Sequence, residues 1–194
     1  NNTFVGSNAG TRSSGTDNTY LGFAAGTRTT AGSVDGDNNI SIGVSSSVNT
    51  TGNGNVSVGY EALATSSYSS TTVDEMVSIG YQAHKGVARF SAASVAIGTQ
   101  AAATTNGVTN SVSIGHNAAG SINGDVNTSV AMGYATAYNA SDLVNSTILG
   151  AQAGFNNNFI TNEDKGSVLI GYNAGFLLIK PPSTEKRGAN IIIG

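Results

Sequence analysis

The 194-residue sequence has no cysteine, no tryptophan, two prolines and few charged residues. Without cysteine the chain has no disulfide framework, no thiolate metal site and no cysteine nucleophile. Its eight basic residues form no cluster and are outnumbered by eleven acidic ones, which argues against contact with nucleic acid or an anionic membrane surface. Long apolar runs are also missing, because the longest, at residues 176–179, is far too short to span a membrane.

Glycine is abundant instead, with 26 residues, and hydrophobic residues make up 39% of the chain. A chain this apolar with only 10% charged residues does not have the composition of a disordered protein. The sequence therefore indicates an ordered fold that depends on glycine.

A short motif recurs along the whole chain. Residues 94–98 read Ser-Val-Ala-Ile-Gly, and close copies occupy residues 111–115, 129–133 and 167–171. Divergent copies bring the number to eleven, each ending in a glycine. These glycines are Gly6, Gly22, Gly43, Gly59, Gly80, Gly98, Gly115, Gly133, Gly150, Gly171 and Gly194, and they are spaced 16 to 23 residues apart.

Each motif has the pattern of a short strand closed by a turn. The residues one and three places before the glycine are mostly β-branched or aliphatic and share one face, while the residue between them faces the other way. The glycine suits a positive φ at the point where the chain leaves the strand. We predict an all-β fold, a parallel β-solenoid flattened into a β-roll, with about ten coils of 16–23 residues in one domain over residues 1–194.

Two positions vary together in these coils. Where the middle strand residue is large, as at Phe4 or Tyr20, the fourth residue after the glycine is Gly10 or Gly26. Where the middle residue is Ser or Ala, that later residue is larger. We predict that the two positions share one small interior space, because close-packed interiors conserve volume.

The outer apolar residues of the strands would form a long bare row on a single chain. Monomers rarely expose contiguous apolar patches beyond a few hundred Å². We therefore expect self-association along this row.

The motif resembles the head repeat of trimeric autotransporter adhesins of the YadA-like type, with the signature Asn-Ser-Val-Ala-Ile-Gly-x-x-Ser/Ala. Residues 94–98 with Ala101 carry the resemblance, which extends over essentially the whole chain. It implies a left-handed β-roll, a homotrimer about a common axis and an adhesive role outside the cell. The variants at Thr3 and Thr19 are similar to repeats of phage and viral tail fibres, so a bacterial adhesin and a virion fibre both stay open.

Four longer spacings predict insertions near residues 27–38, 64–75, 155–166 and 176–189. Loops on a rigid scaffold are common binding sites. The last insertion holds both prolines and three basic residues, so we consider it a possible contact loop. Its residues are Lys180, Pro181, Pro182, Glu185, Lys186 and Arg187.

The sequence offers no strong metal, cofactor or catalytic site. Residues 35–38 read Asp-Gly-Asp-Asn but lack the spacing and closing Glu of an EF-hand, so a polar turn is favoured. His116 follows a motif glycine where other coils have Phe or Tyr, which favours a stacked aromatic over a catalytic base. That row, with Tyr60 among its members, fits stacking of coils or chains better than a sugar-binding ladder.

Catalysis by paired carboxylates has little support. The acidic residues lie mostly between motifs, at Asp74, Glu75, Glu163 and Asp164, where solvated turn residues are expected. We predict no enzyme activity, no cofactor and no bound metal. A polysaccharide-processing solenoid is the less favoured alternative.

The predicted protein is an extracellular adhesin or fibre head segment that attaches through loops on a stiff rod. Its partners are two further copies of the chain and a host-surface protein or glycan, with no nucleic acid and no membrane contact by this segment. A tail-fibre receptor-binding segment and a purely structural fibre spacer remain alternatives. Since both ends fall within a motif, we expect a piece of a longer fibre.

Overall fold

The computed structural model describes residues 1–28, 36–65, 73–86, 91–122, 124–140, 142–156, 166–176 and 191–194. Most of each predicted insertion, and the whole predicted contact loop from Lys180 to Arg187, lies outside these residues. The described part of the chain contains strands and turns but no helix.

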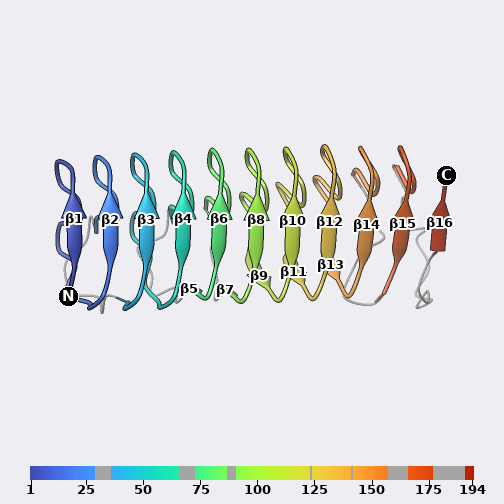
Figure 1. Ribbon diagram of the computed structural model, residues 1–194. Helices are drawn as coiled ribbons and strands as arrows, with labels where there is room; N and C mark the ends of the chain where they lie inside the picture. Colours follow the sequence, from blue (N-terminus) through green and yellow to red (C-terminus); the bar gives the residue numbers. More distant parts are fainter. Residues whose placement is uncertain are drawn as a thin grey trace.

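Eleven short strands form one parallel sheet along the molecule (Figure 1). They are β1 (Thr3–Val5), β2 (Thr19–Leu21), β3 (Ile40–Ile42), β4 (Val56–Val58), β6 (Val77–Ile79), β8 (Val95–Ile97), β10 (Val112–Ile114), β12 (Val130–Met132), β14 (Thr147–Leu149), β15 (Val168–Ile170) and β16 (Ile191–Ile193). The register pairs equivalent motif positions, so that Val112 lies between Val95 and Val130. The two termini lie at opposite ends of this stack.

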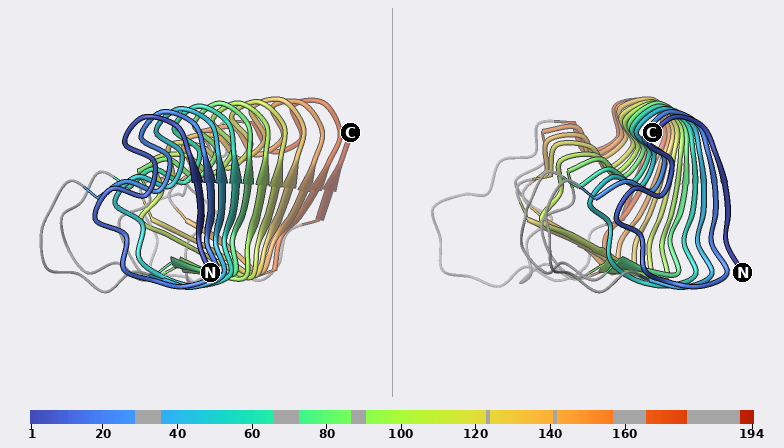
Figure 2. Two further views of the ribbon diagram at one scale, coloured as in Figure 1. Left: turned by 60° about the vertical axis from the view of Figure 1, so that its left-hand side comes forward. Right: turned by 90° about the vertical axis from the view of Figure 1, so that its left-hand side faces the viewer.

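Five strands in the middle of the chain form a second parallel sheet (Figure 2). They are β5 (Val73–Asp74), β7 (Ser91–Ala92), β9 (Gly107–Thr109), β11 (Asp125–Asn127) and β13 (Leu143–Val144). The all-β class and the parallel β-solenoid are thus confirmed. The number of coils, the handedness and the assembly remain predictions.

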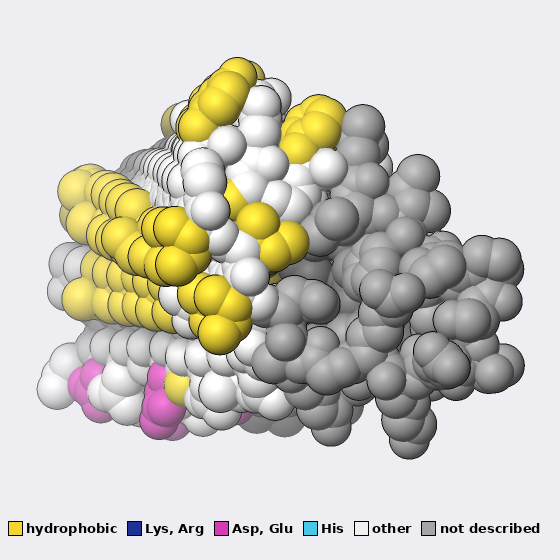
Figure 3. Space-filling view, turned by 90° about the vertical axis from the view of Figure 1, so that its right-hand side faces the viewer, with side chains coloured by type: hydrophobic (Ala, Val, Ile, Leu, Met, Phe, Trp, Pro, Cys, Tyr) yellow, Lys and Arg dark blue, Asp and Glu magenta, His cyan; other side chains and the backbone are white. Residues whose placement is uncertain are grey.

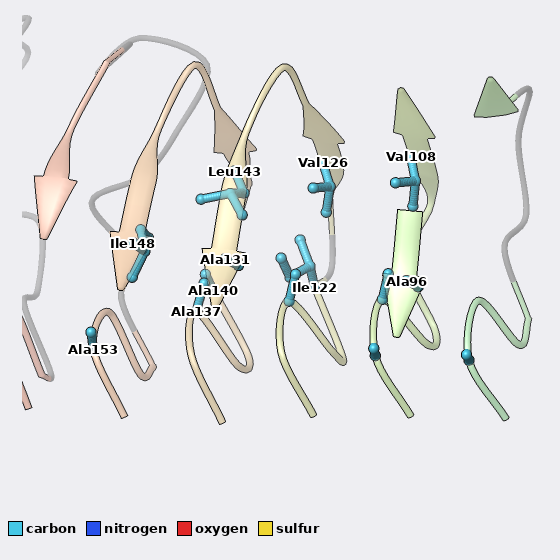
Figure 4. Packing of buried hydrophobic residues seen from close by; sticks show 14 of the residues in the cluster. Ala96, Val108, Ile122, Val126, Ala131, Ala137, Ala140, Leu143, Ile148 and Ala153 are labelled. Atoms are coloured by element: carbon cyan, nitrogen blue, oxygen red, sulfur yellow. The ribbon is translucent and has the colours of Figure 1, made fainter. Parts of the chain in front are cut away.

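The core lies inside the coils, between the main sheet, the second sheet and the turns that follow the motif glycines. The middle residue of each main-sheet strand points inward, as at Ala96, Ala131 and Ile148, all of which are fully buried. Val108 and Leu143 of the second sheet contribute to the same buried cluster. Figure 4 shows these side chains and neighbouring turn residues gathered in rows along the stack. Alanine three places after most motif glycines keeps the turn close to this core.

The motif glycines form a column in which each one lies against the next coil. From Gly6 to Gly171 their φ angles lie between +125° and +138°, a region that disfavours other residues. A Cβ on Gly98 would lie 2.5 Å from the carbonyl oxygen of Gly115. Gly194 is the exception, since a Cβ there would meet no atom within 4 Å. The glycine is required by close approach between coils as well as by backbone conformation.

The turn after each glycine has left-handed residues at its second and fourth positions. Gln100 has φ +55° and Ala102 has φ +49°. The N–H of Gln100 donates to Tyr81 in the preceding coil, and that of Ala102 donates to Ala118 in the following coil. The N–H groups of the second and fourth turn residues therefore point to opposite neighbouring coils.

The predicted exchange of volume is confirmed for Phe4 with Gly10 and for Tyr20 with Gly26. A Cβ on Gly10 would lie 2.5 Å from the ring of Phe4, and one on Gly26 would meet the ring of Tyr20. In a coil with a small middle residue, His84 fills the space, and its Nδ1 lies 2.7 Å from Oγ of Ser78.

A ladder of side chains joins the coils at the start of the main-sheet strands. Asn18 Oδ1 accepts from the N–H of Asn39, and Asn39 Oδ1 accepts from the N–H of Asn55. Serines continue this role, since Ser94 Oγ accepts from the N–H of Ser111. Asn39 and Asn55 begin Asn-x-Ser sequons, but both side chains are buried and bonded.

We predict that Gly26→Ala destabilises the fold because its methyl group would overlap the ring of Tyr20. Overpacking of this kind costs about 1–3 kcal/mol. Gly54 is a matched control: its φ of +68° resembles the +62° of Gly26, but a Cβ there meets only Glu75 Cγ, at 3.8 Å. Chemical denaturation should show a larger loss for Gly26→Ala than for Gly54→Ala. Adding Tyr20→Ala should recover part of the difference, and equal losses in the two single variants would contradict the shared space.

Candidate binding groove

The outer side chains of the main sheet form an exposed apolar face. These are the first and third residues of each strand, which are apolar except for Thr3, Thr19 and Thr147. Figure 3 shows apolar stripes that run along the molecule. Exposed members are Val5, Leu21, Ile40, Ile79, Ile97, Met132, Ile191 and Ile193. We call the whole set of first and third strand residues the apolar face.

An aromatic row borders the apolar face, at the position directly after the motif glycine. Tyr60 and Tyr81 stack with ring centroids 5.2 Å apart, and His116 stacks on Tyr134 at 5.3 Å. These pairs confirm the stacking of one coil on the next and the interpretation of His116 as a substitute aromatic. Within each pair each ring covers one face of its neighbour, although Tyr60, Tyr81 and Tyr134 stay exposed.

A groove of about 350 Å³ crosses successive coils on a different part of the turn. Gln82, Gln100 and Asn117 line it, each two places after a motif glycine. Thr104 and Ser121, each six places after a motif glycine, also line it. The volume lies within the usual range of small-molecule sites. We call this space the amide groove.

The amide groove follows from a change of size at the fifth position after the glycine. Ala103 and Gly120 are small at this position, whereas Tyr138 and Phe155 are large. Tyr138 lines the groove, and its ring approaches Gly120, where a Cβ would lie 3.3 Å from Tyr138 Cδ2. Its other neighbour is Phe155, on which it stacks at 5.6 Å. Small residues open the groove, and an aromatic ring limits it.

Lys85 lines the amide groove and also a second space of about 260 Å³. The second space is lined as well by Ser45, Val48 and Glu61 of earlier coils. Lys85 Nζ lies 2.5 Å from Glu61 Oε2. Hydrogen bonds from Lys85 and Gln82 lower the pKa of Glu61, so the carboxylate remains charged and paired.

Hydrogen bonds align the polar side chains of the groove. Gln82 Nε2 donates to Glu61 Oε2 at 2.7 Å, and Gln100 Nε2 donates to Gln82 Oε1 at 3.0 Å. Ser121 Oγ donates to the Tyr138 hydroxyl at 3.2 Å. In the described part of the chain, Oε1 of Gln100 and the Asn117 amide have no hydrogen-bond partner.

The predicted polar turn at residues 35–38 is described only from residue 36 onward. Asp37 Oδ1 accepts from the N–H of Thr16 at 2.6 Å. Asp74 Oδ1 accepts in the same way from the N–H of Asn53 at 2.7 Å. These two carboxylates join neighbouring coils. Among described residues, no three His, Cys, Asp or Glu side chains gather in a group that could hold a metal ion.

Glu163 and Asp164 lie outside the described part of the chain, as does the predicted contact loop. The second histidine of the chain, His84, lies inside the core: it is fully buried, and burial lowers its pKa to about 3. Its Nε2 has no hydrogen-bond partner among the described residues. A neutral, enclosed imidazole is a core residue and not an accessible base.

Sequence reasoning did not find the amide groove. The signal was present, because Gln82, Gln100 and Asn117 share one motif position while Ala103 and Gly120 share another. The left-handed turn that directs these positions to one surface could not be derived from the strand pattern.

We predict that His84 makes the fold less stable as the pH falls from 6.5 toward 5. The unfolded chain takes up the proton at its ordinary pKa of 6.5, whereas the folded chain resists it down to about 3. Stability is therefore full above pH 6.5 and should fall by about 1.4 kcal/mol for each pH unit below it.

Chemical denaturation between pH 7.5 and 5 measures this slope. His84→Ala should flatten it, because Ala102 occupies the same position in the next coil. If His84→Ala kept the same slope, a group other than His84 would cause the pH dependence of stability.

Comparison of this chain with protein families, with curated proteins and with solved structures gives no match. Within the described residues there is also no helix long and apolar enough to cross a membrane. The features of the chain that bear on function are therefore the apolar face, the amide groove and the repeat itself.

Proposed function

We propose that this chain is a segment of an extracellular homotrimeric fibre whose role is attachment to a surface. The observation that carries the proposal is the apolar face. It extends over the whole eleven-stranded sheet, and Ile97 and Met132 within the stack remain 37% and 40% exposed.

Covering the apolar face would stabilise an assembly through the hydrophobic effect. Each Å² of apolar surface removed from water contributes about 25 cal/mol. A second copy of the chain has the same length and the same repeat spacing, so its face matches the first along the full rod. Self-association is therefore the covering that the repeat favours.

The trimeric state and the left-handed hand of the β-roll are what the resemblance to YadA-like heads implies. Three chains about one axis would turn their apolar faces inward and leave the turns outside. The amide groove would then be present three times on one rod. Repeated weak contacts give strong attachment when they act together, which suits an adhesin head or a viral fibre segment equally.

We propose no enzymatic role. Asp37 and Asp74 accept hydrogen bonds from the backbone of neighbouring coils, and the carboxylate of Glu61 is held by Lys85. Glycoside hydrolysis needs two carboxyl groups facing one bond, one of them able to release a proton. The proposed fibre binds its target and leaves it intact.

We expect the chain in solution to have a mass near three times 19.4 kDa by light scattering after size-exclusion chromatography. Ile97→Asp should shift the mass toward that of one chain, because a carboxylate on the apolar face would be buried by association. Asn110→Asp is the control, since it adds the same charge at an exposed site in the turn before β10.

Circular dichroism should show a β-fold for both variants. A single-chain mass for the unmodified protein at micromolar concentration would refute the assembly. Release of sugars from a polysaccharide by the unmodified protein would refute the absence of enzyme activity.

A further inference from the structure

We propose that the amide groove binds a linear, uncharged oligosaccharide that lies along the rod. This inference rests on the proposed attachment function and names the chemical class of the target. It is carried by the arrangement of Gln82, Gln100 and Asn117 beside the hydroxyls of Thr104 and Ser121.

The free polar atoms of the groove match sugar hydroxyls. A sugar hydroxyl both donates and accepts, and so does a carboxamide through its two ends. Oε1 of Gln100 and the whole amide of Asn117 make no hydrogen bond to described residues. Gln82 and Gln100 are themselves aligned by the chain of bonds that starts at Glu61. Because these amides are held in place, they lose little side-chain freedom when a ligand binds.

The backbone of the groove argues against an extended peptide. The N–H groups of Ala103 and Gly120 donate to the carbonyls of Gln100 and Asn117 within their own turns. Those of Thr104 and Ser121 donate to the preceding coil. A peptide strand that adds to a sheet edge needs free backbone donors. The groove offers side chains instead.

The charges of the groove argue against an anionic ligand. Among the described residues of its lining, Lys85 is the charged one, and its ammonium group is 2.5 Å from Glu61. An acidic sugar or phosphate would have to compete with that carboxylate. Neutral hydroxyls bind beside the ion pair without breaking it.

The repeat of the solenoid argues for a linear ligand. Equivalent amides on stacked coils recur about every 4.8 Å along the axis, so three of them span about 10 Å. The small residues Gly86, Ala103 and Gly120 complete the lining and leave room for the C–H surface of a sugar ring. Tyr138 gives the groove an aromatic boundary, a common partner for such surfaces.

The test uses the 194-residue chain on an array of short neutral oligosaccharides made from hexoses and N-acetylhexosamines, with sulfated and sialylated glycans and an extended peptide library alongside. Saturation-transfer NMR with the strongest neutral ligand gives its affinity. We expect binding to a subset of neutral oligosaccharides. Binding only to anionic glycans or only to peptides would overturn the inference, as would an array with no neutral ligand.

Two variants test whether the ligand binds in the amide groove. Ala103→Phe should abolish binding by filling the groove with a ring that Phe155 carries at the same motif position. Gln100→Ala should weaken binding about tenfold, the effect of losing one or two hydrogen bonds. Gln152→Ala is the matched control, since Gln152 has the same motif position and a φ of +56° against +55° for Gln100 but lies outside the groove.

Thermal melting and light scattering show whether each variant keeps its fold and its mass. Unchanged binding in a folded Ala103→Phe variant would refute the site even if the chain is a trimer. A single-chain mass with groove-dependent sugar binding would refute the proposed assembly and leave the site standing. The two failures are therefore distinguishable.

Discussion

The close stacking of one coil on the next is the constraint on which the rest of the structure depends. At Gly98 the backbone approaches Gly115 so closely that no side chain fits between them. The same contact recurs from Gly6 to Gly171 and keeps every motif in register. Once this register is set, each side chain lies above its equivalent in the next coil. Rows of like residues, buried or exposed, follow from that single contact.

These rows explain how a chain with few charges remains ordered and what it presents to its surroundings. Buried rows include small or compensating residues such as Ala96 and His84, and amide or serine ladders join the coils beside them. Exposed rows are the apolar face, the aromatic row and the amide groove. A globular domain buries its apolar strand face against another layer. Here only one face of the main sheet is covered within the described chain, so the proposed assembly supplies the missing layer.

The sequence was sufficient for the parts of the fold that repeat at every coil. Residues 94–98 and their copies predicted the strands, the inward middle residue and the exchange of volume between Tyr20 and Gly26. The sequence was insufficient for the proposed binding site, which depends on the backbone conformation between motifs. The left-handed residues Gln100 and Ala102 follow no pattern of residue type, because their conformation is imposed by bonds to two neighbouring coils. The amide groove therefore appeared only in three dimensions, and the contact loop predicted at residues 180–187 lies outside the described residues.

Because the chain has no cysteine, the assembly can be measured with a spin label at a single introduced cysteine. A single cysteine in place of Thr99, at the border of the apolar face, can carry a nitroxide spin label without competing thiols. Pulsed dipolar spectroscopy on the labelled chain then reports distances between copies only. A three-fold assembly predicts one intermolecular distance with the modulation depth of three coupled spins. A decay without dipolar modulation, from a chain that keeps its β-fold, would contradict the central claim that copies of this chain cover its apolar face.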